Sequence, residues 1–414
     1  MVSTLVIGVD EVWLKGANRR RYLAHLRYNI QETLRAFHPT YLQIESEGPL
    51  FWVTSHQEFS PATLAAVCKV PGVHGVEVAY KIDEISAERT PLTLDERLQI
   101  MGKFLIELGD DLLGKATTFK VDTRRSYKQF PGTSHLISRR LGAMVVQAYP
   151  HLRVDLERPS RVARVRIMKR GVFISLRQLK GVGGLPLGTS GHLLCLLSGG
   201  MDSPVASYLL ATRGSRQTFV FFYAYPFVSH EAKDKVMELV KVLSLYQNVG
   251  NLVVVPFAEV QNRIAETAEM SYRTVFFRRY MIRCANMLAQ ALGAQGLIMG
   301  DSLGQVSSQT LENMSALDHD SALLILRPLV GLNKEAIIRY AEQIGTFPIS
   351  KIPHQDACQL FAPQHPVTKV DLDYWRAYEE SQDWNVVLQR ALAQREHYTI
   401  TKTGVIARAP HLEG

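Results

Sequence analysis

The segment Ser198-Gly199-Gly200-Met201-Asp202-Ser203 is the feature that most restricts the fold of this chain. It directly follows the apolar run 193–197 and precedes the helical pattern that begins at Pro204. This order predicts a short buried strand, a tight turn and a helix. Glycines allow the backbone to approach a ligand closely, so the amides of the turn and of the helix N-terminus form an anion site. We expect Ser203 to cap the helix and Pro204 to occupy its first position.

The turn lacks the Gly-Lys-Ser/Thr ending of a Walker A loop. It resembles the SGGxDS loop of the PP-loop ATP pyrophosphatases, which cleave ATP between the α- and β-phosphates and adenylate a substrate. An ordinary glycine turn between a strand and a helix is the alternative. The resemblance implies ATP as the nucleotide and leaves the substrate open.

Length and composition predict a globular enzyme of two or three domains. The chain has 414 residues, of which 46% are hydrophobic and 21% are charged. Its apolar runs are too short for a membrane span, and residues 1–8 are typical of a strand and not of a signal peptide. The four cysteines are widely spaced, without a Cys-x-x-Cys pair, which argues against a disulfide scaffold or a local zinc or iron–sulfur knuckle. We therefore expect a cytoplasmic protein without a membrane partner.

The positive charge is concentrated in one block. Residues 111–180 carry 16 basic and 4 acidic side chains, whereas residues 1–110 carry 11 basic and 14 acidic ones. Such a block predicts a module that binds a polyanion, here nucleic acid. A solvated charged face is the alternative. The candidate RNA-binding residues are Arg124, Arg125, Lys128, Arg139, Arg140, Arg164 and Arg166.

Element patterns predict an α/β protein with three domains. Residues 1–75 show the order β-α-β-β-α-β, which is typical of a ferredoxin-like α+β domain. Residues 76–180 contain the basic block, in which strand 161–167 alternates apolar and basic residues and is expected to present one cationic face. Residues 181–188 are rich in glycine and form the expected linker. Strands and helices then alternate through 181–414, which predicts a doubly wound parallel sheet with ligands at the carboxyl ends of its strands.

Several longer stretches resemble one family of PP-loop enzymes. Residues 14–19 read LKGANR, residues 119–125 resemble a THUMP RNA-binding domain, and residues 183–191 match a linker. Residues 300–310 read GDSLGQVSSQT, and residues 356–363 surround Cys358. These stretches are similar to the tRNA 4-thiouridine synthetases, also called tRNA uracil 4-sulfurtransferases. The chain ends about 55 residues after Cys358, so it resembles the short form without a rhodanese domain.

The resemblance implies an ATP-dependent sulfurtransferase. Uridine 8 of tRNA would be adenylated, with ATP converted to AMP and diphosphate, and its O4 would be replaced by sulfur from a persulfide. Implied partners are tRNA, a cysteine desulfurase or another persulfide donor, a second copy of the chain, and a thiamine sulfur-carrier protein. Sulfur delivery to the thiamine thiazole and a catalytically silent tRNA-binding protein are the alternatives that stay open.

The resemblance also assigns roles to residues. Asp202 would be catalytic and hold Mg²⁺, although a loop aspartate of this kind often caps the adjacent helix instead. Cys358 would carry sulfur, although its residue type alone fits a packed small hydrophobe equally well. The implied ATP-binding residues are Leu196, Leu197, Ser198, Gly199, Gly200, Ser203, Phe221, Phe222, Arg278, Gly300 and Gln309. Arg278 would stabilise charge on the α-phosphate, and the remaining cysteines are expected in the core.

Overall fold

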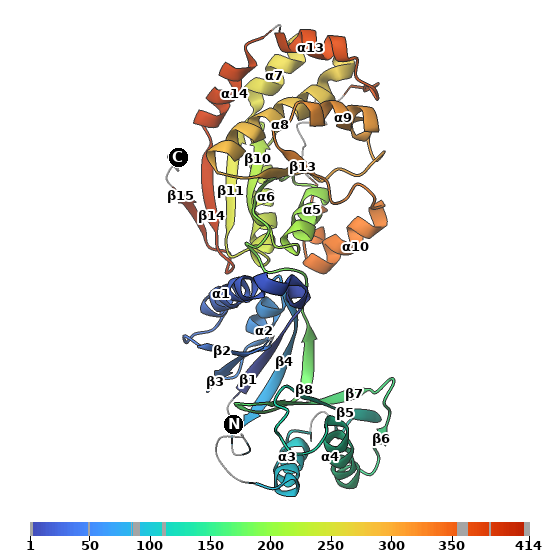
Figure 1. Ribbon diagram of the computed structural model, residues 1–414. Coiled ribbons are helices and arrows are strands. Elements are labelled where there is room, and N and C mark those ends of the chain that lie inside the picture. The colour runs from blue at the N-terminus through green and yellow to red at the C-terminus, as the bar shows by residue number, and fades with distance from the viewer. Residues whose placement is uncertain are drawn as a thin grey trace. The chain divides into compact units, whose positions relative to one another are not determined.

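The chain forms two compact units in the computed structural model, Met1–Gly183 and Gly184–Gly414 (Figure 1). The structure describes residues 3–48, 50–83, 85, 92–109, 113–353, 363–380 and 382–409. The boundary between the units falls inside the expected linker 181–188. The further division of the first unit near residue 75 stays a prediction.

The first part of unit 1 has the expected ferredoxin-like order. Its elements are β1 (Ser3–Val9), η1 (Glu11–Asn18), α1 (Arg19–Phe37), β2 (Ile44–Glu47), β3 (Leu50–Ser55), α2 (Pro61–Cys68) and β4 (Val73–Ile82). The strands lie in the order β2-β3-β1-β4 and pair antiparallel. Leu26, Ile30 and Leu34 of α1 are buried in the same cluster as the strand residues Leu5 and Ile7. The apolar face of α1 thus covers one face of this sheet.

The basic region continues the same sheet. Its elements are α3 (Leu94–Gly109), β5 (Thr118–Arg125), α4 (Ser134–Ala148), β6 (Arg153–Val154), β7 (Arg161–Met168) and β8 (Gly171–Lys180). β8 pairs antiparallel with β4, from the pair Gly75 and Lys180 at one end to the pair Ile82 and Val172 at the other. The result is one eight-stranded sheet, β2-β3-β1-β4-β8-β7-β5-β6. This backbone pairing holds the basic region to the ferredoxin-like part, which the sequence did not indicate.

Glu77 of β4 changes the expected character of strand 161–167. Arg166 Nη2 lies 2.5 Å from Glu77 Oε1, and Arg164 Nε lies 3.9 Å from the same atom. Ser175 Oγ donates a hydrogen bond of 3.2 Å to Glu77 Oε2. The Arg166 and Arg164 side chains are only 11% and 19% exposed. The cationic face expected for strand 161–167 is therefore largely buried and paired at these two positions, because Glu77 lies on β4, only one strand away from β7 across β8.

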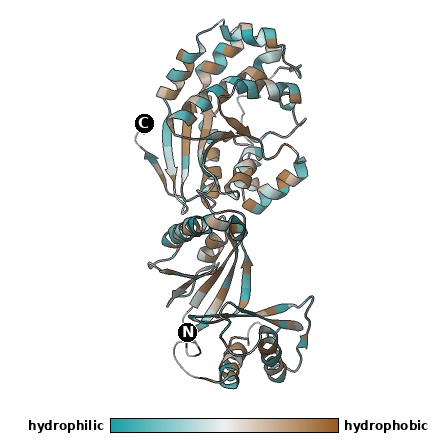
Figure 2. Cartoon of the chain, viewed as in Figure 1, coloured by the Kyte–Doolittle hydropathy of each residue, from teal (hydrophilic) through white to brown (hydrophobic). Residues whose placement is uncertain are grey.

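Unit 2 is built on a mainly parallel sheet. Its elements are β9 (His192–Leu196), α5 (Asp202–Ala211), β10 (Arg216–Tyr223), α6 (His230–Ser244), β11 (Gly250–Pro256), α7 (Ala258–Thr267), η2 (Met270–Tyr272), α8 (Arg273–Ala291), β12 (Gly296–Ile298), η3 (Ser307–Gln309), α9 (Leu311–His319), β13 (Leu324–Leu326), α10 (Lys334–Ile344), α11 (Phe347–Ser350), α13 (Leu372–Glu380), α14 (Trp384–Ala393), β14 (Glu396–Ile400) and β15 (Ile406–Ala409). The strand order is β13-β12-β9-β10-β11-β14-β15. Hydrophobic colour marks much of the central strands in Figure 2, as expected for strands covered on both faces.

The strand order places a topological switch point beside β9. The chain proceeds from β9 through β10 to β11 on one side and then returns to place β12 and β13 on the other. Loops that leave β9 and β12 therefore diverge over a crevice, where doubly wound sheets bind ligands. The expected parallel fold is confirmed, and β14 and β15 add an antiparallel edge that was not predicted from the sequence. Among the described residues, no helix is both long and apolar enough to cross a membrane.

The substitution Glu77→Gln tests the join between the two parts of unit 1. It removes the negative charge that two largely buried guanidiniums share, and breaking such a buried pair costs about 3 kcal/mol. We expect this loss in the free energy of opening, measured by hydrogen exchange of peptides that cover β4 and β8. Asp83→Asn is the control, because the Asp83 side chain is 55% exposed in its pair with Lys81, and such a pair should contribute less than about 1 kcal/mol. Equal effects of the two substitutions would contradict the proposed weight of Glu77.

Candidate nucleotide-binding and catalytic site

The loop between β9 and α5 is held by its own serines. Ser203 Oγ accepts a hydrogen bond of 2.9 Å from the Ser198 amide and lies 3.1 Å from Ser198 Oγ. The Gly200 amide donates to Ser198 Oγ at 3.3 Å. Because α5 begins at Asp202, the expectations that Ser203 caps the helix and that Pro204 takes its first position are wrong. Ser203 instead closes the loop, and the cap residue Met201 offers no side-chain hydrogen bond to the helix N-terminus.

Gly300 brings the loop after β12 against this phosphate loop. A Cβ built on Gly300 would lie 2.7 Å from the Ser203 nitrogen and 2.8 Å from the Asp202 carbonyl carbon. Both neighbours are backbone atoms, so a side chain at residue 300 would displace one loop from the other. The structure therefore brings together Gly300 and the SGGMDS turn, two motifs about one hundred residues apart in the chain.

Asp202 is engaged by two side chains from other elements. Lys334 Nζ lies 2.8 Å from Asp202 Oδ1, and Gln305 Nε2 donates to Oδ2 at 2.9 Å. Lys334 is the first residue of α10, where a cation opposes the helix dipole. A lysine in this unfavourable place, paired with the phosphate-loop aspartate, indicates a functional role. Lys334 is not among the residues predicted from the sequence, because no motif around it signals that role.

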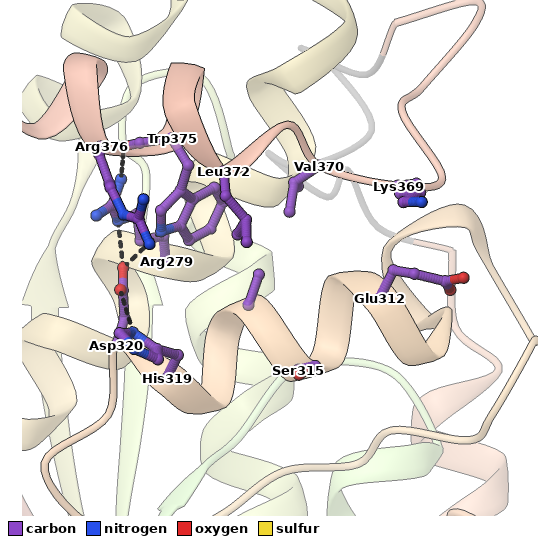
Figure 3. Close-up of a pocket in the computed structure, with 11 residues that line it drawn as sticks. Arg279, Glu312, Ser315, His319, Asp320, Lys369, Val370, Leu372, Trp375 and Arg376 are labelled. Atoms are coloured by element: carbon purple, nitrogen blue, oxygen red, sulfur yellow. Dashed lines mark hydrogen bonds and ion pairs between the residues drawn. The ribbon is translucent and has the colours of Figure 1, made fainter.

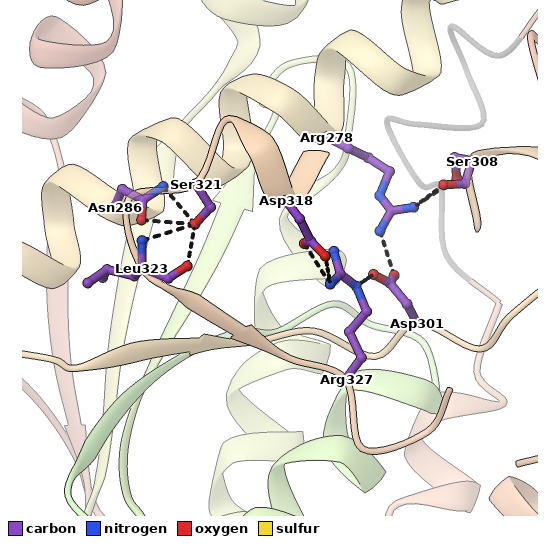
Figure 4. A network of polar contacts seen from close by, with 8 residues as sticks. All are labelled: Arg278, Asn286, Asp301, Ser308, Asp318, Ser321, Leu323 and Arg327. Atoms are coloured by element: carbon purple, nitrogen blue, oxygen red, sulfur yellow. Dashed lines mark hydrogen bonds and ion pairs between the residues drawn. The ribbon is translucent and has the colours of Figure 1, made fainter. Parts of the chain in front are cut away.

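Asp301 organises a second polar cluster (Figure 4). Arg278 Nη2 lies 2.5 Å from Asp301 Oδ1, and Arg327 Nε lies 2.8 Å from Oδ2. Arg278 also donates to the Ser308 carbonyl at 2.8 Å and to Ser308 Oγ at 3.1 Å. Burial alone raises the pKa of Asp301, but Arg278 and Arg327 outweigh it and hold the pKa of this carboxyl below its usual value. The ionised carboxylate thereby fixes the direction of the Arg278 guanidinium.

Two buried polar atoms beside Asp301 have no partner in the part of the chain that the structure describes. They are Gln309 Oε1 and Arg327 Nη2. Gln309 Nε2 donates to Asp301 Oδ1 at 3.4 Å, so the amide oxygen points elsewhere. Buried polar atoms without partners are rare in folded proteins. Here they fit a site whose ligand supplies the missing hydrogen bonds.

Apolar residues border the phosphate loop on the side of β10. The Leu197 amide donates to the Val220 carbonyl at 2.9 Å, which keeps the ends of β9 and β10 adjacent. Leu196 and Phe222 are only partly buried, and the Phe222 ring lies 4.7 Å from that of Phe257. These side chains give the loop an apolar border, which suits a base joined to phosphates.

The cysteines divide as expected where the structure describes them. Cys195 and Cys284 are buried and Cys68 is partly buried. Burial raises the pKa of the Cys284 thiol to about 12 and that of Cys68 to about 11, and it raises the pKa of Cys195 as well. None of these three forms a useful thiolate near neutral pH. Cys358 lies outside the described residues, so its role stays a prediction.

The RNA-binding candidates of unit 1 differ in how free their charges are. Lys128 and Arg139 are exposed. Arg124 is exposed and lies 3.5 Å from Asp122, and Arg140 pairs with Asp95 at 2.8 Å. Arg125 donates to the carbonyls of Phe130 and Gly132, and Arg164 and Arg166 face Glu77. Lys128, Arg139 and Arg124 are therefore best placed to meet phosphates.

A cavity of about 330 Å³ lies between α9 and α13 (Figure 3). Its lining includes Arg279, Asp320 and Trp375, and none of the candidate site residues. Arg279 Nε lies 2.5 Å from Asp320 Oδ2, and the Trp375 indole donates to the same oxygen at 3.0 Å. Since Asp320 is already paired with Arg279 and Trp375, and no candidate residue lines the cavity, the cavity does not define the functional site.

Within the described residues, no group of three or more His, Cys, Asp or Glu side chains is arranged to hold a metal ion. A dedicated protein cage for a metal is therefore not part of the described structure. Asp202 stays the one candidate ligand from the sequence analysis, and its two carboxylate oxygens already accept from Lys334 and Gln305.

Fold and site together define the class of the protein. A phosphate loop at the switch point of a parallel sheet is the arrangement of a PP-loop nucleotide-binding domain. Residues 4–76 match the model of the ThiI ferredoxin-like domain, residues 106–177 match the THUMP domain, and residues 188–384 match the model described as thiamine biosynthesis protein (ThiI).

Relatives along the whole chain identify the family. The "Probable tRNA sulfurtransferase" of Clostridium kluyveri is 34% identical over 396 residues, 96% of this chain and 99% of that protein. The protein of the same name from Thermoanaerobacter pseudethanolicus is 38% identical over 384 residues, 93% and 96% of the two chains. The chain belongs to the tRNA sulfurtransferase family, which confirms the resemblance found in the sequence.

A solved structure that covers nearly the whole chain agrees with this assignment. A "4-thiouridine synthetase - RNA complex with bound ATP" is 28% identical, with a TM-score of 0.85 over 97% of this chain and all of that one. PH1313 from Pyrococcus horikoshii shares the fold, with a TM-score of 0.64 at 22% identity over 83% of this chain and 99% of that one.

Gly300→Ala tests the close approach of the two loops. The added methyl group must push against the backbone of α5, and such overpacking lowers the free energy of unfolding by about 1–3 kcal/mol. Calorimetry should show a lower melting temperature for unit 2. Gly331→Ala is the matched control, because nothing lies within 4 Å of its Cβ position. An unchanged melting temperature for Gly300→Ala would show that the loops tolerate separation.

Proposed function

We propose that this chain is an ATP-dependent enzyme that converts a uridine of tRNA, expected at position 8, to 4-thiouridine. The observation that carries the proposal is the phosphate loop packed on Gly300, with Asp202 and Lys334 paired at its edge. The similar 4-thiouridine synthetase was solved with RNA and bound ATP. Its likeness over nearly the whole chain supports the same ligands here.

ATP fits the residues around the loop. Loop amides and the N-terminus of α5 suit the phosphates, and Leu196, Leu197, Phe221 and Phe222 suit the base. Gln309 Oε1 and Arg327 Nη2 are a buried acceptor and donor that a nucleotide would satisfy. Ser198, Gly199, Gly200, Ser203 and Gly300 would lie against the phosphates.

Mg²⁺ fits as an ion that arrives with the nucleotide. It prefers one or two carboxylates together with substrate phosphates over an all-protein cage. Asp202 supplies one such carboxylate, and Lys334 beside it moderates the negative charge. When bound, the ion would neutralise charge on the departing diphosphate.

The first chemical step is adenylation of the uridine. O4 of the uracil attacks the α-phosphorus, an O4–P bond forms, and diphosphate leaves as the N3 proton passes to solvent. Arg278, held by Asp301 and Ser308, would stabilise charge on the α-phosphate. Lys334 would offset charge on the departing diphosphate at the opposite end of the phosphate chain.

The second step is sulfur transfer. The terminal sulfur of a persulfide on Cys358 attacks C4, and AMP leaves with the former O4. An external thiol then cleaves the remaining sulfur–sulfur bond, is itself oxidised to a disulfide with Cys358, and leaves sulfur on C4. A second thiol regenerates Cys358, and a cysteine desulfurase or another persulfide donor recharges it.

Unit 1 would hold the tRNA. Its THUMP region supplies exposed cations, with Lys128, Arg139 and Arg124 in the best position. The family suggests a homodimer, and a tRNA substrate would place the enzyme in the cytoplasm. Both statements belong to the proposal.

Sulfur delivery for the thiamine thiazole is the second candidate. The description of the matching model, thiamine biosynthesis protein (ThiI), favours it. Transfer of sulfur to a small carrier protein in the absence of tRNA would support this role.

Nucleoside mass spectrometry tests the main proposal directly. Purified protein is incubated with unmodified tRNA, Mg-ATP, a cysteine desulfurase, cysteine and a thiol reductant. We expect 4-thiouridine with the wild type and none with Cys358→Ala, which should still release AMP in the presence of tRNA. Asp202→Asn should lower AMP release by about 10²–10³-fold, the scale of a lost electrostatic contact in an active site.

The outcomes separate the assignments. Thiouridine from Cys358→Ala would overturn the relay role and leave the reaction intact. Absence of both AMP and thiouridine from the wild type, with tRNA still bound, would favour a silent tRNA-binding protein.

Salt dependence tests the tRNA surface. If about five phosphates are contacted, log affinity should fall with log salt at a slope of roughly −4. Replacing Lys128 and Arg139 together by alanine should reduce the steepness by roughly 1.5, since each phosphate contributes ~0.7–0.9. Arg390→Ala in α14 is the control and should leave the slope unchanged. An unchanged slope in the double variant would place the tRNA on another surface.

A further inference from the structure

Lys235 is a buried lysine in the middle of α6. Its residue is only 5% exposed. The ammonium donates hydrogen bonds of 2.9 Å to the Ser350 carbonyl and of 2.6 Å to the Ile352 carbonyl. Burial lowers the pKa of this ammonium. A buried cation is costly, so its retention in the core of unit 2 calls for a reason.

Ser350 links this lysine to the phosphate loop. It is the last residue of α11, and its hydroxyl donates to the Gly200 carbonyl at 3.2 Å. Gly200 is therefore held on both sides, because its amide donates to Ser198 Oγ. A continuous path of hydrogen bonds runs from Lys235 through Ser350 to the turn that would hold the phosphates of ATP.

The position of this path along the chain gives it meaning. Lys235 binds the carbonyls of residues 350 and 352, and Cys358 follows six residues after Ile352 in the sequence. A lysine fixes the course of the main chain when its ammonium donates hydrogen bonds to main-chain carbonyls. If the C-terminal end of a helix needed only a positive charge, an exposed lysine would supply it.

We propose that Lys235 is a positioning residue for sulfur transfer, which holds residues 350–352 against the phosphate loop and so fixes the start of the segment that leads to Cys358. This inference rests on the proposed function. Lys235 touches neither nucleotide nor uracil in the proposal, and it acts through the backbone at residues 350–352.

The chemistry gives the proposal a specific signature. Once O4 is adenylated, either the persulfide or water attacks C4. Persulfide attack gives 4-thiouridine and AMP, whereas attack by water restores uridine and releases the same AMP. A sulfur carrier that is no longer anchored loses this competition, so AMP continues to form without thiouridine.

The ratio of 4-thiouridine formed to AMP released is therefore the decisive readout. In the complete assay, Lys235→Met should lower this ratio at least ten-fold while tRNA-dependent AMP release falls by less than three-fold. Ser350→Ala keeps the carbonyl that Lys235 binds and loses only the link to Gly200, so it should lower the ratio two- to five-fold. Lys241→Met is the matched control on α6, because Lys241 pairs with exposed Glu238, and it should leave the ratio unchanged.

A merely structural lysine would give a different result. Equal loss of AMP and thiouridine in Lys235→Met, or an unchanged ratio, would overturn the inference. If Lys235→Met does not fold, Ser350→Ala decides, and an unchanged ratio there overturns the inference too. Failure of the wild type to form thiouridine would instead overturn the proposed function, so the two failures are distinguishable.

Discussion

The absence of a side chain at residue 300 is the constraint on which the site of unit 2 depends. Strands β9 and β12 are neighbours, but their following loops diverge, so something must bring those loops back together. Gly300 does so, because a Cβ there would lie 2.7 Å from the Ser203 nitrogen. Asp202 stands directly before that contact and Asp301 directly after Gly300. One close approach thereby sets both carboxylates in place.

The two carboxylates perform different electrostatic work. Asp301 is buried and shared by Arg278 and Arg327, which keep it ionised, so it serves as a fixed anchor for Arg278. Asp202 is more accessible, with a side chain 24% exposed, and it pairs with Lys334, whose side chain is 45% exposed. An exposed pair can rearrange when an anion and its counterion arrive, whereas the buried cluster cannot do so cheaply. The site thus combines a rigid cluster around Asp301 with an ion pair at Asp202 that can rearrange.

Local patterns predicted what depends on local sequence. The turn after β9, the alternation of strands and helices, and the ferredoxin-like order were all readable, because neighbouring residues determine them. The role of Lys334 could not be predicted in this way, because its pairing with Asp202 joins residues far apart in the chain through the packing of α10 on α5. Arg166 was misjudged for the same reason: its pattern is that of an exposed strand face, and only the pairing of β4 with β8 supplies the buried Glu77. Local motifs thus predicted the type of reaction, whereas contacts between distant residues determine which charged side chains are unpaired and available.

The phosphate loop also joins the two halves of the proposed reaction. Its amide side suits the nucleotide, and the Gly200 carbonyl, on the other side of the same turn, accepts from Ser350. In the proposed reaction, adenylation would take place on a loop that Ser350 ties to the stretch of backbone preceding Cys358 in the sequence. Since Lys235 of α6 binds the carbonyls of residues 350 and 352, the loop and this stretch of backbone share one support, and the segment that we propose to carry sulfur continues from it.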